Sequence, residues 1–347
     1  MNWRNEGAKL DTQAASYRFV ERPNCPACRS PTAAALYACD FTEPPIATFV
    51  SNQYKIPTSV LASGRYELMR CGHCGLYYQR WMGDTDLLSE LYGVWVNDCN
   101  IPDIDEIYQK ELRHFAQSRD AHEIVAVASF IGVPVSRLRT LDYGMGWALW
   151  ARIAKALGCH SFGTELSPAR MDYAHFHGVE VLQDDEIGEA AFHFINTEQV
   201  MEHLSDPFNT GKRLAAALIP GGILKISVPS GEEVDRRLSR LKRGSDANVR
   251  GHLAGIEPLE HVNCFTKKSL VKLAESLGLE IVRPALRDAY AFLRLPGGVS
   301  LARPAKTAKE LIRPIYQFHN PRNLYVWMRK VPDQAIGVLG ELNGVGR

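Results

Sequence analysis

From about residue 138 onward, short apolar runs alternate with stretches in which apolar residues recur every three or four positions. Runs of the first kind are typical of strands, and stretches of the second kind are typical of helices. The predicted strands cover 138–143, 160–164, 179–182, 192–196, 222–228, 279–283 and 323–329, and the predicted helices cover 147–157, 167–177, 206–218 and 266–277. Because strands and helices alternate in this way in parallel sheets with helices on both faces, the pattern predicts an α/β fold.

The pattern before residue 138 is different. Residues 21–85 contain several prolines and only short strand-like runs, and a helical pattern follows over 104–130. With 347 residues, the chain is long enough for two domains. We expect a lead-in over 1–20, a small domain over 21–100 and the α/β domain over 101–347. Segment 230–260 is long and lacks a regular pattern, which favours a lid or substrate loop.

Two Cys-x-x-Cys pairs, Cys25 with Cys28 and Cys71 with Cys74, are the clearest chemical signal in the small domain. Each pair places two thiolates on one tight turn, and four thiolates form a closed tetrahedral zinc site. Such a zinc ion is structural, because four sulfur ligands leave no position for a reacting water. Iron in place of zinc and four unrelated core cysteines remain alternatives. The remaining cysteines lack paired spacing and are expected to be buried free thiols: Cys39, Cys99, Cys159 and Cys264.

A glycine turn follows the first strand of the α/β domain. Gly144 and Gly146 allow a tight turn and a close approach of the backbone to a ligand. Asp142 precedes the turn, and Glu165 ends the next strand, where a carboxylate can accept both ribose hydroxyls. A dinucleotide turn requires a third glycine at the position of Leu149, so a nicotinamide enzyme is disfavoured. An acid before the turn can bind an ammonium group. A ligand with a ribose, an adenine and an amino-acid tail suits both acids, and S-adenosylmethionine (SAM) is such a ligand.

Residues 138–283 resemble the class I SAM-dependent methyltransferase family. Segment 141–148 (Leu-Asp-Tyr-Gly-Met-Gly-Trp-Ala) resembles its first motif, with alanine at the last glycine. Segment 194–203 resembles the family's fourth strand and the Glu-His that follows it, and 218–222 matches the turn before strand five. With both cysteine pairs included, the chain is similar to a bacterial subgroup that has an N-terminal zinc-binding domain and includes sugar C-methyltransferases. The resemblance implies a Rossmann-like sheet of seven, mostly parallel strands with a small zinc-knuckle domain.

The resemblance also implies a set of cofactor-binding residues. The set is Asp142, Tyr143, Gly144, Gly146, Glu165, Leu166, Asp184, Thr197 and Glu198. Asp142 and the two glycines are expected to hold the methionine end of SAM, and Glu165 the ribose. Asp184 is either an acceptor for the adenine amino group or a solvated loop acid. Thr197 and Glu198 are expected to line the floor of the cofactor site.

Methyl transfer to most acceptors requires removal of a proton, and histidine is the usual base at neutral pH. In the sugar enzymes a Glu-His pair lies after strand five, and Glu260 with His261 resembles it. His261 is the first candidate base, with Glu260 orienting its ring or acting as the base itself. His203 is the second candidate. A structural role remains open for each histidine: His203 at a helix start, and His261 in fixing the loop before helix 266–277.

Overall composition limits the partners. There are 40 Lys and Arg residues against 39 Asp and Glu, so the chain lacks the basic excess of a dedicated nucleic-acid binder. The chain shows no apolar signal region and no run of about 18 apolar residues, which predicts a cytoplasmic protein without a membrane span. A basic group in the irregular segment either clamps an anionic acceptor or is a solvated helix face: Arg236, Arg237, Arg240, Lys242, Arg243 and Arg250.

We therefore expect methyl transfer from SAM to a small polar acceptor, such as a sugar, a glycan or a natural-product intermediate. An anionic or nucleotide-linked acceptor is among the alternatives. Two other functions remain open: an RNA or protein methyltransferase that docks its substrate on the zinc domain, and a catalytically silent scaffold with the same fold. The sequence leaves the acceptor atom and the oligomeric state undetermined.

Overall fold

The computed structural model of the chain describes residues 17–96, 103–244, 248–294 and 304–331. Cys99 and most of the predicted lead-in lie outside these residues. The chain divides into two compact units, which are described separately. Unit 1 contains the described residues before position 97 together with Glu202–Pro207 and Pro229–Leu270. Unit 2 contains the described residues of Ile101–Met201, Phe208–Val228 and the segment from Val271 onward.

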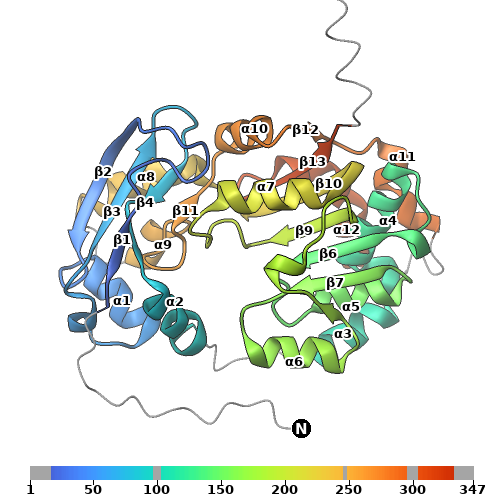
Figure 1. Cartoon of the computed structure of the whole chain (residues 1–347), viewed down its shortest axis with the longest axis horizontal. Helices are drawn as coiled ribbons and strands as arrows, with labels where there is room; N and C mark the ends of the chain where they lie inside the picture. Colours follow the sequence, from blue (N-terminus) through green and yellow to red (C-terminus); the bar gives the residue numbers. More distant parts are fainter. Residues whose placement is uncertain (1–16, 97–102, 245–247, 295–303, 332–347) are drawn as a thin grey trace, which may run out of the picture. The chain divides into compact units, whose positions relative to one another are not determined.

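Unit 2 is built on a seven-stranded sheet with the strand order β12-β13-β10-β9-β6-β7-β8 (Figure 1). Its strands are β6 (Arg139–Tyr143), β7 (His160–Thr164), β8 (Glu180–Val181), β9 (Phe192–Glu198), β10 (Leu218–Pro229), β12 (Leu279–Val282) and β13 (Asn323–Lys330). The five strands from β10 to β8 pair in parallel, whereas β12 and β13 pair antiparallel. This mostly parallel sheet confirms the predicted Rossmann-like class I fold.

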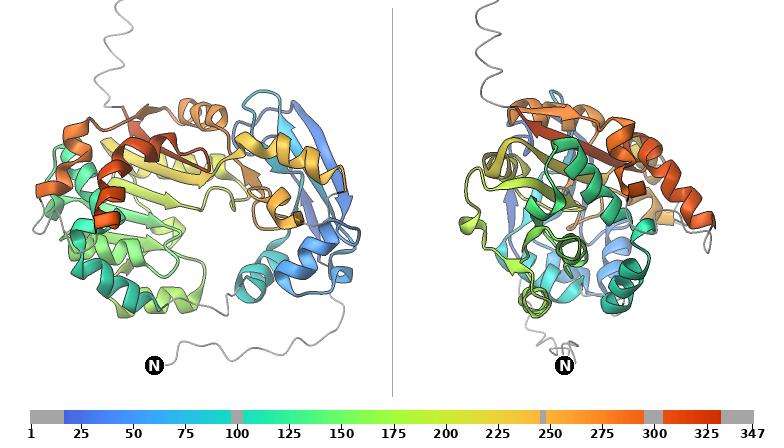
Figure 2. Two further views of the ribbon diagram at one scale, coloured as in Figure 1. Left: turned by 180° about the vertical axis from the view of Figure 1, so that it is seen from behind. Right: turned by 90° about the vertical axis from the view of Figure 1, so that its right-hand side faces the viewer.

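Helices cover both faces of this sheet. They are α3 (Ile104–Arg113), α4 (Arg119–Ile131), α5 (Leu149–Ala156), α6 (Pro168–Phe176), α7 (Pro207–Ala217), α11 (Leu286–Ala289) and α12 (Pro304–Tyr316). In Figures 1 and 2, α7 lies across one face, and α4 and α5 pack together on the other. Buried apolar side chains of α4, α5 and the strands form one core, with Trp150, Phe194 and Trp327 in its middle. Burial of such large side chains contributes about 1.5–3 kcal/mol each.

The predicted helix over 104–130 is two helices in the structure. The first, α3, ends at Arg113, and a short 3-10 turn over Phe115–Gln117 follows. Ser118 then begins α4, because its hydroxyl accepts a hydrogen bond of 3.3 Å from the backbone N–H of Ala121. An N-terminal cap of this kind satisfies an N–H that has no partner inside the helix. The apolar period continues across the break, which explains why the pattern predicted one helix.

Unit 1 contains a four-stranded sheet in the order β11-β4-β3-β2 and a two-stranded sheet of β1 and β5. Its strands are β1 (Phe19–Glu21), β2 (Ala33–Asp40), β3 (Arg65–Cys71), β4 (Tyr77–Gln79), β5 (Trp81–Gly83) and β11 (Asn263–Cys264). Its helices are α1 (Ile46–Tyr54), α2 (Thr85–Glu90) with a π-helical turn over Leu91–Trp95, α8 (Val234–Leu241) and α9 (Val249–Leu253). Helix α10 (Lys267–Ser276) follows β11 and continues into unit 2.

The expected irregular segment 230–260 is largely helical, since it contains α8 and α9. Val234, Leu238 and Leu241 of α8 are buried in an apolar core that also contains side chains of α1 and β3. Charged residues occupy most other positions of α8, so the few apolar positions did not stand out in the sequence. The core of unit 1 therefore depends on α8 and α9, which are remote along the chain from α1 and β3.

Further 3-10 turns within the described residues cover Thr58–Leu61, Val135–Arg137, Asp184–Glu186, Gly231–Glu233, Ala291–Arg294 and Gln317–His319. None of the helices in this part of the chain has the length and apolar character that crossing a lipid bilayer requires.

Candidate functional site

The four paired cysteines come together in unit 1, as the sequence predicts. Their ligand sulfurs all lie within 4.8 Å of one another. Cys25 Sγ is 3.6 Å from Cys74 Sγ, and Cys28 Sγ is 3.6 Å from Cys71 Sγ. Zinc–sulfur bonds of about 2.3 Å in a tetrahedral site place the sulfurs roughly 3.8 Å apart. The donor set and its spacing therefore fit a tetrahedral metal ion such as zinc.

The two cysteine turns have matching backbones. In the first, the N–H of Arg29 donates to the carbonyl of Cys25 at 2.9 Å; in the second, the N–H of Gly75 donates to the carbonyl of Cys71 at 3.0 Å. Arg29 and Gly75 both have positive φ, 62° and 79°, which turns the chain after the second cysteine of each pair. The possible competing ligand His73 is exposed. Among the other cysteines, Cys159 and Cys264 are buried and Cys39 is half-buried.

The glycine turn in unit 2 connects β6 to α5. Gly144 and Gly146 have φ values of 72° and 54°, in the left-handed region that favours glycine. A Cβ on Gly144 would meet the Val200 side chain at 2.7 Å, so this position also lacks room. Ala148, at the place of the last glycine of the motif, has a φ of 55°. The turn therefore keeps the backbone shape of the motif even where alanine replaces glycine.

Glu165 lies directly against this turn. Its Oε2 accepts a hydrogen bond of 2.9 Å from the N–H of Gly146, and its Oε1 accepts from the N–H of Leu166 and of Ser167. Leu166, the next residue, is 89% exposed although it is apolar. The structure thus brings three members of the predicted cofactor-binding set together: Gly146 of the turn, Glu165 after β7, and the exposed side chain of Leu166.

Asp142 is buried at the end of β6. Asn196, opposite it on β9, donates a hydrogen bond of 2.7 Å to its carboxylate. Burial raises the pKa of Asp142 to about 7, while the Asn196 hydrogen bond and the Lys225 charge act in the opposite direction. A carboxyl group with this pKa changes its charge near neutral pH, so its interaction with a cation depends on pH.

Lys225 is a buried cation that the sequence analysis missed. It lies within the apolar strand β10, is 1% exposed, and donates to Asn196 Oδ1 at 2.8 Å and to the Glu198 carboxylate. Arg119 pairs with the other Glu198 oxygen at 3.2 Å. Burial by itself raises the pKa of Glu198, but Lys225 and Arg119 hold it below the ordinary value. The sequence signal was a lysine inside an apolar run. Burial of a charge without a partner costs free energy, so a lysine at such a position indicates a buried carboxylate or polar partner.

Two other predicted residues have internal partners. The hydroxyl of Thr197 is buried and donates to the carbonyl of Lys225 at 2.8 Å. Asp184, after β8, accepts hydrogen bonds from Arg213 at 2.7 Å and from the Tyr143 hydroxyl at 3.4 Å. Arg213 also donates to the Tyr143 oxygen at 3.0 Å. Asp184 and Tyr143 of the predicted set are therefore joined through an arginine that the sequence analysis did not select.

The candidate bases lie in unit 1. The rings of His203 and His261 have their centroids 4.8 Å apart, although 57 residues separate them along the chain. His261 Nδ1 lies 2.5 Å from an oxygen of Glu257. Burial by itself lowers the pKa of His261, but Glu257 and two neighbouring carboxylates raise it above the ordinary value. The carboxylate that contacts the His261 ring is therefore that of Glu257, four residues earlier, and not that of the adjacent Glu260.

His203 and Glu260 complete this group. His203 Nδ1 is 3.0 Å from the carbonyl oxygen of Glu260 and 3.2 Å from the hydroxyl of Tyr92. Burial and the nearby His261 lower the pKa of His203 to about 4. The Glu260 carboxylate lies 3.0 Å from the Tyr54 hydroxyl and accepts from Gln53, and burial raises its pKa. Tyr54, Tyr92 and Glu257 were missed from the sequence, although Glu257 is only four residues from His261.

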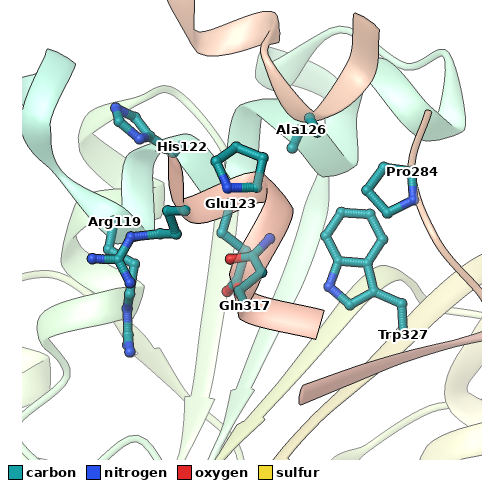
Figure 3. Close-up of a pocket in the computed structure, with 10 residues that line it drawn as sticks. Arg119, His122, Glu123, Ala126, Pro284, Gln317 and Trp327 are labelled. Atoms are coloured by element: carbon teal, nitrogen blue, oxygen red, sulfur yellow. The ribbon is translucent and has the colours of Figure 1, made fainter. Parts of the chain in front are cut away.

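The pockets of the described residues include one in each unit. The first, in unit 2, is a small gap between α4 and the segments near Pro284, Gln317 and Trp327 (Figure 3). Its arginines have carboxylate partners, Arg119 with Asp120 and Glu198 and Arg313 with Glu310, so we interpret it as a packing gap. The second, in unit 1, has about 250 Å³ of free space between α1 and α9 and is lined by Thr48, Phe49, Asn52, Gln53, Asn248, Val249 and Arg250.

Comparison with known proteins places these sites in context. A methyltransferase domain family model matches residues 108–283, just over half of the chain. No curated protein matches the chain. Solved structures with a similar fold include a SAM-dependent methyltransferase from Archaeoglobus fulgidus, with 14% identity and a TM-score of 0.39 over 71% of this chain and 100% of that one.

Two further solved structures are comparable in extent. A putative sarcosine dimethylglycine methyltransferase from Galdieria sulphuraria is 17% identical over 71% of this chain and 97% of its own, with a TM-score of 0.38. The 1,6-didemethyltoxoflavin-N1-methyltransferase of Burkholderia thailandensis, solved with S-adenosylhomocysteine, is 17% identical over 71% and 86%, with a TM-score of 0.38. Because the family model covers more than half of its length, the chain belongs to the methyltransferase domain family.

Proposed function

We propose that the chain transfers a methyl group from SAM to a small polar acceptor, such as a sugar, a glycan or a natural-product intermediate. The cluster of His203, His261, Glu257 and Glu260 assists in removing a proton from that acceptor. The observation that carries this proposal is the meeting of two half-buried histidines from separate segments, each with a polar group close to its Nδ1. A structural core alone seldom gathers so many titratable side chains, whereas active sites do so regularly.

The reaction requires one bond to form and one to break. An electron pair of the acceptor forms a bond to the SAM methyl carbon while the carbon–sulfur bond breaks, and S-adenosylhomocysteine leaves as a neutral thioether. The acceptor proton passes to a base of the cluster and then to solvent. The protein contributes alignment of the two reactants and this proton transfer.

In this proposal the predicted cofactor-binding set holds SAM in unit 2. Asp142 and the close backbone of the Gly144–Gly146 turn line the methionine end, Glu165 takes the ribose hydroxyls, and Leu166 contacts the adenine. Glu165 already accepts from the N–H of Gly146, so it is held where the ribose would lie next to the turn. Asp184 binds the adenine amino group if Arg213 leaves one of its oxygens available. Thr197 and Glu198 support the floor of the site through Lys225.

The pocket between α1 and α9 is the proposed acceptor pocket. It combines three amide side chains, Asn52, Gln53 and Asn248, with the apolar surface of Phe49 and the cation Arg250. Amides both donate and accept hydrogen bonds, which suits a hydroxyl-rich molecule. Gln53 also contacts Glu260, which connects this pocket to the histidine cluster. Arg250 gives the pocket one positive charge for an anionic group on the acceptor.

Two other arginines of the expected clamp, and two arginines on the sheet of unit 1, have carboxylate partners. Arg236 and Arg237 both pair with Glu233 on α8. On the sheet of unit 1, Arg70 pairs with Asp235 and Arg80 pairs with Glu21. Neutralised arginines attract a nucleic-acid backbone weakly. These pairs favour a small acceptor over RNA, and they agree with the similarity to the zinc-containing subgroup that includes sugar C-methyltransferases.

The test has two steps. First, SAM and S-adenosylhomocysteine should each raise the melting temperature of the full chain, because a ligand that binds only the folded state stabilises it. Second, release of S-adenosylhomocysteine should be measured with a panel of nucleotide-linked sugars, free sugars and short RNAs. Turnover with a sugar class that Arg250→Gln weakens, through a higher KM, supports the proposal. Turnover only with RNA, or no stabilisation by either cofactor, contradicts it.

A further inference from the structure

Unit 1 contains a second group of side chains with metal-ligand chemistry, separate from the four cysteines. One ligand atom each of Glu202, His203 and His261 lies within 4.8 Å of the other two. Glu202 is only 1% exposed. Two imidazoles and one carboxylate form a ligand set that first-row transition-metal ions commonly adopt in proteins.

The Nδ1 partners of the two histidines determine which ring nitrogen is available. A carbonyl oxygen only accepts hydrogen bonds, so the contact of 3.0 Å between His203 Nδ1 and the Glu260 carbonyl places the proton on Nδ1. The Glu257 carboxylate lies 2.5 Å from His261 Nδ1, and its negative charge favours a proton on that nitrogen. Each ring therefore presents its Nε2 as the nitrogen that can bind a metal ion. Metal-binding histidines almost always donate their other ring N–H to a carboxylate or a carbonyl in this manner.

We propose that Glu202, His203 and His261 bind one divalent first-row transition-metal ion, such as manganese, cobalt, iron or zinc. Glu257 and the carbonyl of Glu260 are positioning groups that orient the two rings. Three protein ligands leave coordination positions open, in contrast to the closed set of four cysteines. An ion held in this way lowers the pKa of a hydroxyl group that binds to it, which would ease loss of the acceptor proton. Because the ion and the Nδ1 proton occupy both nitrogens of each ring, the Glu260 carboxylate is the member of the cluster that takes this proton when the ion is bound.

This role in proton removal rests on the proposed function, whereas binding of the ion does not. Glu202 follows the last residue of β9 by only four positions along the chain, and β9 carries Thr197 and Glu198 of the predicted cofactor-binding set. The segment with Glu202 and His203 therefore follows closely after β9, the strand that carries two residues of the predicted cofactor-binding set. A sugar hydroxyl or a phenol is the acceptor class that gains most from such an ion, because neither loses its proton readily at neutral pH.

Cobalt(II) is the probe of choice for binding. The full chain is first loaded with zinc at the cysteines and treated with a mild chelator, and cobalt is then added without SAM or acceptor. We expect uptake of one cobalt ion per chain, with visible absorption bands of nitrogen and oxygen ligands and without the intense near-ultraviolet band of thiolate ligands. His203→Gln, His261→Gln and Glu202→Gln should each weaken cobalt binding by more than about tenfold.

His252→Gln is the matched control, because His252 is a buried histidine of α9 in the same unit and lies outside the cluster. Its cobalt affinity should equal that of the wild type. If a ligand variant fails to fold, paramagnetic broadening of the wild-type histidine NMR signals by manganese(II) replaces it, and His203 and His261 should broaden before His252. No cobalt uptake by the zinc-loaded wild type, or unchanged uptake by the ligand variants, overturns the proposal. Because no step depends on methyl transfer, failure here leaves the proposed function intact.

Discussion

Asn196 donates a hydrogen bond of 2.7 Å to Asp142 across the β6–β9 pair, and both side chains are buried. Burial raises the pKa of Asp142 to about 7. The unfolded chain releases this proton near pH 4, so between about pH 4 and about pH 7 the folded state binds more protons than the unfolded state. The contribution of Asp142 to stability therefore falls as the pH rises through this window.

Asp142→Asn should remove this dependence. The variant keeps an oxygen that accepts from Asn196, and it carries no charge. We expect the difference in unfolding free energy between variant and wild type to change by on the order of 3 kcal/mol between about pH 4 and about pH 7.5, in favour of the variant at the higher pH. Urea denaturation at both pH values measures it. Parallel pH profiles for the two proteins would show that the pKa of Asp142 is the same in the folded and unfolded states.

The same carboxyl group should make SAM binding depend on pH. If Asp142 interacts with the ammonium group of SAM, affinity should rise as the pH passes through about 7, because only the ionised carboxylate attracts a cation. Calorimetric titration with SAM at about pH 6 and about pH 8 tests this in wild type and Asp142→Asn. The variant should bind more weakly at the higher pH and show a flatter profile. An equal rise in both proteins would assign the effect to another group.

Gly144 and Gly146 offer a matched pair of substitutions. Both have positive φ, so alanine strains either position, but only at Gly144 does a Cβ collide with another side chain, that of Val200 at 2.7 Å. Gly144→Ala should therefore lower the melting temperature and the SAM affinity more than Gly146→Ala, by about 1–3 kcal/mol in unfolding free energy. Differential scanning fluorimetry with and without SAM compares the two. A larger loss of stability in Gly146→Ala would contradict this account of the turn.

The cysteine cluster predicts a specific response to metal removal. Cys71→Ser should release the metal and destabilise unit 1, because a structural metal contributes directly to folding free energy. Cys39→Ser is the control, since Cys39 lies on β2 of the same unit and outside the cluster. Metal content by mass spectrometry and zinc release to a colorimetric chelator measure the effect. The interpretation fails if Cys71→Ser retains as many zinc ions per chain as Cys39→Ser.

Lys225 should be required for the stability of unit 2. Lys225→Met leaves the partly buried Glu198 with Arg119 as its remaining cation, and removal of one partner from a buried ion pair costs about 3–5 kcal/mol. Lys272→Met, which removes an exposed pair with Glu275, should cost less than about 1 kcal/mol. Chemical denaturation of both variants makes the comparison. Equal, small effects would mean that Glu198 becomes neutral when Lys225 is absent.

The sequence by itself determined the α/β fold, the glycine turn and the pairing of the four cysteines. These features depend on local rules: apolar periodicity, left-handed glycines, and pairs of cysteines with two residues between them on one turn. The predicted strand 160–164 matches β7, and most other predicted elements differ from the observed ones by only a few residues. The long predicted helix over 104–130 was one exception, because a serine cap interrupts the backbone without interrupting the apolar pattern. Segment 230–260, expected to be irregular, was another, because it contains α8 and α9.

Only the tertiary structure decided which charged side chains meet. Glu257, not the adjacent Glu260, contacts the ring of His261, and His203 joins them from a segment more than fifty residues earlier. Lys225 of β10 pairs with Glu198 of the neighbouring strand β9. Partners of buried polar groups are set by strand register and by the cost of leaving a charge unpaired, and both depend on contacts between remote segments. Local patterns therefore fixed the backbone, and long-range packing fixed the chemistry of the site.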